Sequence, residues 1–338
     1  MDNSFAQEFR FLIRVKTLLL LFQLPFLYRL RLLRWPRWNH RDAGVRRIGR
    51  LMLPAIFGSS VAQINLLFGT LVASFLVTGS VSWLYYSDRL VELPLGVFGI
   101  ALATAILPSL AKNHAQNSQS EFAHTLDWGL RLTLVVGLPA TLGLMLLSGQ
   151  IVTTLFHYGE FSAHDTQMTA LSLTTYSLGL LGFIAVKVLA PGFFARQDTK
   201  TPVVIGVIAM VANMLLTAIF VVPMLLLELP GVHAALALAT ALAAYINAAL
   251  LFVVLRRVGV YRPLAGWGTL GAQTLFANAV MAALLWFGVP HAELWTPLST
   301  GARAGQLLLW ITAAGVVYFV CLIVSGVKLK ELIRLRTS

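Results

Sequence analysis

The sequence predicts an all-α protein, a polytopic transmembrane helix bundle of about eight spans. Of its 338 residues, 58% are hydrophobic and only 11% are charged, whereas soluble globular proteins carry about 25% charged residues. Eight stretches are long and apolar enough to cross a bilayer, which takes about 20 residues each. The connectors between these stretches alternate between basic and non-basic along the chain.

The eight predicted spans follow one another with short polar connectors between them. They cover residues 51–78, 81–110, 128–156, 166–194, 202–227, 231–255, 266–288 and 303–326. The connectors include residues 112–127 and 159–165. Prolines such as Pro94 and Pro139 fall inside the spans, and membrane helices tolerate them. No segment alternates between polar and apolar residues as a strand would.

The first fifty residues differ from the rest because they are strongly basic. An apolar run at 17–28 is too short for a full span, and basic residues flank it on both sides: Arg14, Lys16, Arg29 and Arg31. Two interpretations stay open at this point. The run is either an amphipathic helix lying in the membrane interface or a partial membrane helix within residues 11–33.

The basic residues predict which side of the membrane each connector faces. Segments 1–50, 111–131, 195–202, 256–262 and 327–338 hold 22 of the 25 lysines and arginines. The alternate connectors hold only Arg303, together with four acidic residues: Glu160, Asp165, Glu228 and Glu293. The positive-inside rule therefore assigns the first set, including the C-terminus, to the cytoplasm. The pI of about 10.3 is thus a topology signal, and we expect no nucleic-acid partner.

Three ionisable residues fall inside the second predicted span, where a charge costs at least ~2.5–3.5 kcal/mol. They are Asp88, Arg89 and Glu92, and the three-residue spacing places Arg89 and Glu92 on one helix face. One interpretation is a self-neutralised ion cluster that packs helices together. The other is an anion-binding arginine held by carboxylates, since a guanidinium donates two parallel hydrogen bonds to phosphate.

Further polar residues in the predicted spans allow two interpretations each. Lys187 lies deep in the fourth span, where it either snorkels toward the interface or lines a cavity as a second cation. Asn65, Asn213 and Thr217 either join helices by hydrogen bonds or form an ion site. The sequence offers no carboxylate beside them, so the ion-site signal is weak.

No catalytic motif is present in the sequence. It has no His/Cys/Asp grouping with metal-ligand spacing, no P-loop and no nucleophile elbow, and its single cysteine, Cys321, excludes a disulfide framework. We therefore expect neither an enzyme nor a protein with a cofactor or metal. The remaining classes are a channel, a secondary transporter, a flippase and a structural membrane subunit.

Two long runs resemble the MurJ/MviN family of lipid II flippases. One begins GSVSWLYYSDRL at Gly79 and continues through Glu92, Pro94 and Gly96 to Pro108; the other is KVLAPGFFARQDTKTP from Lys187 to Pro202. The resemblance covers residues 22–338. It implies the fold of the multidrug/oligosaccharidyl-lipid/polysaccharide exporter superfamily, in which two six-helix lobes are followed by two extra helices.

The resemblance also implies a function and a site. The family carries lipid II, the undecaprenyl-pyrophosphate-linked peptidoglycan precursor, from the cytoplasmic to the periplasmic leaflet of the bacterial inner membrane by alternating access. Arg89 matches an arginine of the family's central cavity. Asp88, Glu92 and Lys187 are then the other expected substrate-binding residues. Some members hold sodium on helices that match the first, fifth and sixth spans here, and the missing carboxylate means that sodium coupling is not carried over.

The eight spans resemble the last eight of the family's fourteen helices. Residues 1–50 would then be a basic cytoplasmic or interfacial segment, 51–258 the second lobe, and 259–338 the two extra spans with a basic tail. Because a cavity needs two lobes, expected partners are lipid II, membrane lipids, a missing N-terminal lobe and peptidoglycan-synthesis proteins. The alternatives are an exporter of another polyprenyl-linked sugar or of a drug, and a truncated remnant that transports nothing.

Overall fold

The structure is a computed structural model that describes residues 17–18, 21–30, 43–290 and 292–327. The chain divides into two compact units, Met1–Arg50 and Leu51–Ser338, and each is described by itself. In the first unit, the described residues of the apolar run 17–28 are helical and their side chains are exposed. Arg14, Lys16 and Arg31 lie outside the described residues, as does the basic tail after Val327.

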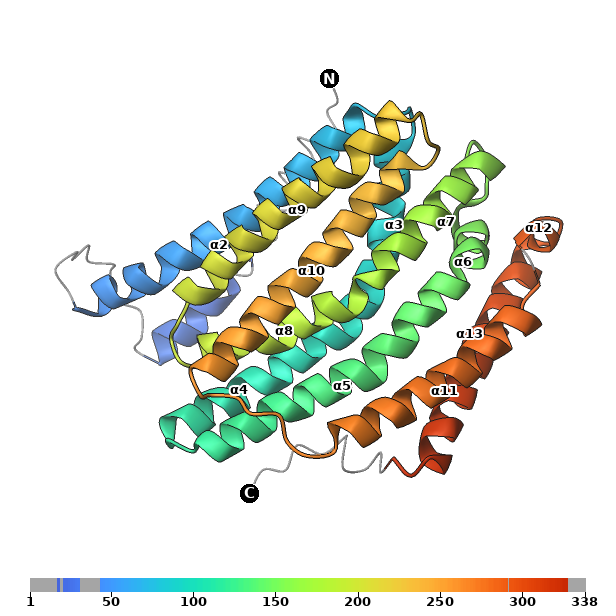
Figure 1. Cartoon of the computed structure of the whole chain (residues 1–338). Helices are drawn as coiled ribbons and strands as arrows, with labels where there is room; N and C mark the ends of the chain where they lie inside the picture. Colours follow the sequence, from blue (N-terminus) through green and yellow to red (C-terminus); the bar gives the residue numbers. More distant parts are fainter. Residues whose placement is uncertain (1–16, 19–20, 31–42, 291, 328–338) are drawn as a thin grey trace. The chain divides into compact units, whose positions relative to one another are not determined.

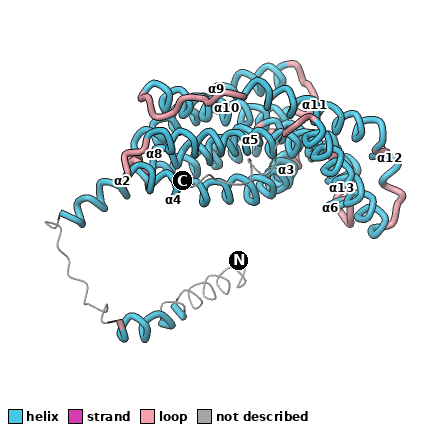
Figure 2. Tube along the Cα trace, turned by 90° about the horizontal axis from the view of Figure 1, so that it is seen from below, coloured by secondary structure: helices cyan, strands magenta, loops and turns pink. Residues whose placement is uncertain are grey.

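The second unit is helical throughout, and its described residues include no strand (Figures 1 and 2). Helix α2 begins in the first unit and runs into this one. The elements are α2 (Ala43–Ser74), α3 (Ser80–Pro94), η1 (Leu95–Ile100), α4 (Ala101–Ala115), α5 (Gln119–Leu146), α6 (Ser148–Phe156), α7 (Ala163–Leu178), α8 (Leu180–Phe194), α9 (Lys200–Leu226), α10 (Val232–Arg257), α11 (Trp267–Gly288), α12 (Ala292–Trp295) and α13 (Thr300–Val324).

Eight helical segments of the described chain are long and apolar enough to cross a membrane. They are Ile56–Ser74, Ser80–Ala115, Gln119–Leu146, Ala163–Phe194, Lys200–Leu226, Val232–Arg257, Trp267–Gly288 and Thr300–Val324. The prediction of a polytopic bundle with eight spans is therefore confirmed, and the chain is a multi-pass membrane protein.

The predicted limits of the third span are wrong. The prediction places it at 128–156, with a connector at 112–127, whereas α5 begins at Gln119 and ends at Leu146. Only residues 116–118 separate α4 from α5. The polar start of α5 resembles a connector in sequence because it contains Asp127, but that carboxylate is buried and neutralised within the helix. The apolar residues after Leu147 form the separate helix α6.

The second span contains a π-helical segment. Pro94 ends α3, and η1 follows it directly over Leu95–Ile100. Proline has no N–H to donate to the preceding turn, and a π-type turn is one way in which a helix absorbs such a break without ending. The span thus continues as α4 to Ala115.

The fourth span breaks at Gly179, between α7 and α8. A Cβ at Gly179 would lie 2.7 Å from the Cα of Ala241 on α10, so only glycine permits this approach. Helix α10 is lined with buried alanines, among them Ala237, Ala239 and Ala244. Small residues let membrane helices pack closely, and α10 accordingly lies against α7, α8 and α9.

Candidate functional site

Helix α3 has one face that packs inside the unit and one that does not. Trp83, Ser87, Val91 and Pro94 are buried and recur at helical spacing. The hydroxyl of Ser87 lies 2.7 Å from the Trp83 carbonyl and 2.9 Å from the Thr169 carbonyl of α7, its two acceptors. These contacts set the rotation of α3 about its axis.

Arg89 and Glu92 lie on the other face of α3, which is exposed. Arg89 Nη1 lies 2.5 Å from Glu92 Oε2, and both side chains are about half exposed (51% and 50%). The Arg89 guanidinium also lies 5.1 Å from the centre of the Tyr85 ring, within cation–π range. The structure therefore brings together the predicted arginine and one of its two predicted carboxylates.

Asp88 is not paired with Arg89 in the described residues. Its side chain is half-buried, and no hydrogen bond or ion pair joins it to Arg89 among the described residues. Asp88 and Glu92 thus differ in their relation to the arginine: only Glu92 forms the ion pair.

Lys187 lies on α8 beside the continuation of α3. Its side chain is exposed, and its Cγ lies 3.6 Å from where a Cβ on Gly99 would stand. The aliphatic part of the Lys187 side chain thus packs near Gly99 of η1. Ten residues separate Arg89 from Gly99, which is roughly 15 Å of helix rise, so the two cations stand at different depths along neighbouring elements.

The amides predicted as packing residues or an ion site join α2 to α9. Asn213 Nδ2 donates to Asn65 Oδ1 at 2.8 Å. Asn213 and Thr217 are both buried, with 4% exposure. No group of three or more His, Cys, Asp or Glu side chains that could hold a metal occurs in the described part of the chain. The direct amide–amide hydrogen bond is what helix packing would produce.

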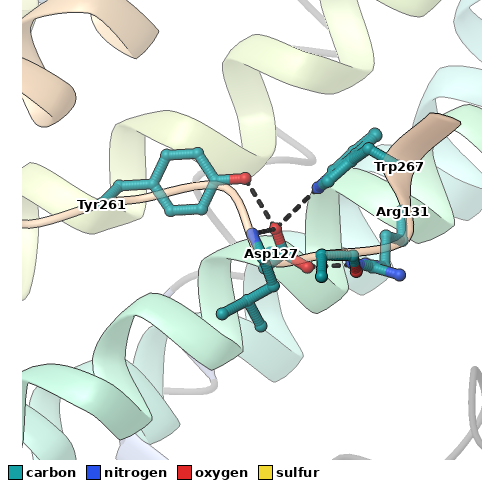
Figure 3. Close-up of polar contacts among 6 residues, drawn as sticks. Asp127, Arg131, Tyr261 and Trp267 are labelled. Carbon is teal, nitrogen blue, oxygen red and sulfur yellow. Dashed lines mark hydrogen bonds and ion pairs between the residues drawn. The ribbon is translucent and has the colours of Figure 1, made fainter.

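The most extensive polar cluster of α5 was not predicted from sequence (Figure 3). Asp127 is 1% exposed, and its Oδ1 accepts hydrogen bonds from the Tyr261 hydroxyl (2.8 Å), the Trp267 indole (2.8 Å) and the Leu264 backbone N–H (3.1 Å). Its Oδ2 lies 2.5 Å from Arg131 Nε. The Asp127 cluster, defined by these five residues, ties α5 to the segment between α10 and α11.

Arg131 completes the Asp127 cluster. Its Nη2 donates to the Ala265 carbonyl at 2.7 Å, and its guanidinium lies 5.4 Å from the centre of the Trp267 ring. Tyr261 lies outside the spans, and burial together with its hydrogen bond to Asp127 raises the pKa of its hydroxyl. The sequence signal was the four-residue spacing of Asp127 and Arg131, which had been assigned to a connector.

Arg303, the one basic residue of the predicted non-basic connectors, is also a buried structural residue. It is 8% exposed in α13, and its guanidinium donates to four backbone carbonyl oxygens, those of Leu298, Thr296, Thr153 and His157. It therefore holds the start of α13 against the end of α6.

The start of α3 is anchored by a second unpredicted cluster. The Trp83 indole donates to Asp165 Oδ1 at 2.8 Å, and the ring of His233 lies 4.8 Å from the Trp83 ring. Asp165, predicted in a connector, instead forms a capping box with Ser162 at the start of α7. This anchor joins α3 to α7 and α10, about two turns before Arg89 along α3.

Comparison with known proteins finds a matching family and several similar proteins. The family described as lipid II flippase MurJ matches residues 16–302. A probable lipid II flippase MurJ of Vibrio cholerae is 47% identical over 312 residues, covering 92% of this chain and 58% of the relative. A probable lipid II flippase MurJ of Haemophilus influenzae is 43% identical over 319 residues, covering 93% and 61%. The chain thus spans about three fifths of the length of these two relatives.

Solved structures agree with this relationship. A lipid II flippase MurJ in an inward closed conformation superposes with a TM-score of 0.66 at 25% identity, covering 88% of this chain and 57% of that one. An outward-facing multidrug transporter of the MATE family superposes with a TM-score of 0.54 at 16% identity, which shows a shared fold alone. With the family match extending over most of the sequence, the chain belongs to the lipid II flippase MurJ family.

Proposed function

We propose that this chain contributes one half of a transporter that carries lipid II across the bacterial inner membrane, from the cytoplasmic to the periplasmic leaflet. The observation that carries the proposal is the ion pair of Arg89 and Glu92 on the exposed face of a membrane span. An arginine that faced lipid there would be costly, whereas one that faces a polar cavity would not.

Arg89 suits a lipid-linked pyrophosphate for chemical reasons. A guanidinium is always charged and donates two parallel hydrogen bonds to a phosphate. Glu92 holds Arg89 in place and reduces the cost of an unoccupied cation in the span. Lys187 supplies a second cation on α8, which packs against η1, the continuation of α3. Asp88 adds a carboxylate next to Arg89 in the sequence. Rocking of two lobes about this site would expose it to each leaflet in turn.

The orientation follows from the alternating charge of the connectors. An even number of spans places the basic segment before α2 and the basic C-terminal tail on one side, which the positive-inside rule assigns to the cytoplasm. A reporter that is active only in the periplasm, fused after Ser338, is expected to stay inactive. The same reporter inserted after Gly159, in the connector between α6 and α7, is expected to be active.

Genetic complementation tests the role of Arg89. A chimera carries this chain in place of the matching part of the Vibrio cholerae relative and is expressed in cells depleted of their own flippase. We expect growth with the chimera, no growth with its Arg89→Ala variant, and growth with Arg257→Ala, which removes an equal charge at the exposed last residue of α10. Immunoblotting of membranes checks that each variant inserts.

Two outcomes would contradict the proposal. Full growth with Arg89→Ala would show that transport does not need Arg89. Failure of the chimera to support growth, although it inserts into the membrane, would show that this chain does not provide the transport function. Growth of depleted cells with residues 1–338 alone would contradict the alternative that the chain is a remnant without transport activity.

A further inference from the structure

An apolar groove of about 540 Å³ lies between α5, α8, α10 and the segment before α11. Its lining includes Leu134, Leu181 and Ala249, and it reaches the surface at Ala249, Tyr245 and Pro263, which are exposed. The volume is within the range of pockets that hold small molecules. The groove is on a different part of the unit from the Arg89 face, because no residue of α3 lines it.

Every polar side chain of the groove is already satisfied by the protein. The Thr133 hydroxyl donates to the Gly129 carbonyl at 2.9 Å, and the Tyr245 hydroxyl to the Leu178 carbonyl at 2.7 Å. Tyr261 and Trp267 both donate to Asp127. The groove therefore offers no hydrogen-bonding group to a polar ligand, and its lining favours hydrocarbon.

The groove runs along α10 toward Arg256. Its lining on this helix extends from Tyr245 to Phe252, a rise of roughly 10 Å, and Arg256 follows Phe252 by one turn. From Tyr245 to Arg256 the helix rises roughly 16 Å, about half of the ~30 Å hydrocarbon core of a bilayer. A lipid whose phosphate lies at Arg256 would therefore place an acyl chain along the lining within one leaflet.

One end of the groove carries an excess of positive charge. Arg256 lies 5.9 Å from the centre of the Phe252 ring, and Arg131 lies 5.4 Å from that of Trp267; both rings line the groove. Arg262 is exposed in the same stretch of chain. Asp127 offsets only one of these three charges, and Arg256 has no carboxylate partner among the described residues.

We propose that this groove binds an anionic phospholipid of the cytoplasmic leaflet, with one acyl chain along the groove and the phosphate at Arg256. The apolar lining, the position of Arg256 one turn beyond it and the other arginines at that end all match this single class of ligand. Basic pockets between spans on the cytoplasmic side are a known mode of lipid headgroup binding. The site is independent of lipid II transport, since it requires only that the chain lies in a membrane.

The test measures lipid binding to the purified 338-residue chain in detergent by native mass spectrometry. Phosphatidylglycerol is expected to bind more tightly than phosphatidylcholine of the same chain length. Arg256→Gln is expected to weaken phosphatidylglycerol binding about fivefold, from ~1 kcal/mol per basic residue near the surface. Arg257→Gln, the adjacent arginine that stacks on no lining residue in the described chain, is expected to change binding less than about twofold.

A second pair of variants tests the hydrocarbon part. Ala249→Phe fills the groove from its exposed edge and is expected to weaken both lipids, whereas Ala279→Phe, at an exposed position of α11 outside the lining, is expected to weaken neither. Size-exclusion profiles and circular dichroism check folding. If Ala249→Phe does not fold, Ala249→Leu is used in its place.

Several results would overturn the proposal. Equal affinity for the two lipids would show that Arg256 does not bind the headgroup, and so would equal losses of phosphatidylglycerol affinity in Arg256→Gln and Arg257→Gln. Unchanged binding in Ala249→Phe would show that the groove does not hold an acyl chain. Binding of glycerol phosphate as tightly as of phosphatidylglycerol would show that the arginines bind phosphate without the groove.

Discussion

Replacing Asp127 by alanine is expected to lower the free energy of unfolding by about 3–5 kcal/mol, the usual cost of removing one partner from a buried ion pair. The carboxylate is 1% exposed and accepts four hydrogen bonds that join α5 to the segment before α11. Its loss leaves Arg131, Tyr261 and Trp267 without their shared acceptor.

Two features of the structure keep the expected cost from being larger than this. Hydrogen bonds to a charged group contribute ~1.5–3 kcal/mol each, and four of them would exceed the estimate if they were additive. They share one carboxylate, so they are not additive. Arg131 is also 22% exposed and can reach solvent once Asp127 is gone. Asp127→Asn keeps one acceptor oxygen and should cost less than alanine.

Denaturant unfolding of the purified chain in detergent, followed by circular dichroism, measures the change from the midpoint and slope. Glu121→Ala on the same helix is the matched control, because Glu121 lies in the first turn and its helix-dipole contribution is only ~0.3–1 kcal/mol. A cost below about 1 kcal/mol for Asp127→Ala would refute the view that this cluster holds the segment before α11 to α5.

Three further predictions concern the same unit. Arg303→Met removes a buried guanidinium that donates to four backbone carbonyls and is expected to cost about 1–3 kcal/mol; a cost equal to that of the exposed control Arg257→Met would contradict this. Gly179→Ala places a Cβ 2.7 Å from Ala241 Cα and is expected to cost about 1–3 kcal/mol, whereas Gly143→Ala has nothing within 4 Å; equal melting temperatures for the two variants would count against the close approach. Because the pKa of Tyr261 is raised above its ordinary value of 10.0, the folded chain keeps a proton that the unfolded chain loses. The free energy of unfolding should therefore fall as pH rises above 10.0. That fall should be smaller in Tyr261→Phe, and an unchanged pH dependence in this variant would contradict the assignment.

The number of spans could be predicted from sequence, because each span needs a long apolar run and the basic connectors alternate independently of that run. The limits of the third span could not. Asp127 looks like a connector residue until its hydrogen-bond partners Tyr261 and Trp267, far away in sequence, are known. Likewise, the sequence shows Arg303 only as an exception in a connector that is otherwise free of basic residues. The structure shows that its guanidinium is buried and donates to backbone carbonyls.

The candidate site shows the same division. The three-residue spacing predicted that Arg89 and Glu92 share a face, and the structure pairs them at 2.5 Å. Spacing alone did not predict which carboxylate, Asp88 or Glu92, pairs with Arg89. The rotation of α3 decides this, and it is set by Trp83 and Ser87 packing against α7. The lipid groove had no sequence signal, since its lining residues come from four separate segments.

The most direct test measures where lipid II stands in the membrane. In cells depleted of their own flippase, the fraction of lipid II accessible to a membrane-impermeant reagent from outside is compared between the Vibrio cholerae chimera and its Arg89→Ala variant. We expect accessible lipid II with the chimera and accumulation of lipid II on the inner leaflet with Arg89→Ala. Equal outside accessibility in both, with equal amounts of protein in the membrane, would contradict it.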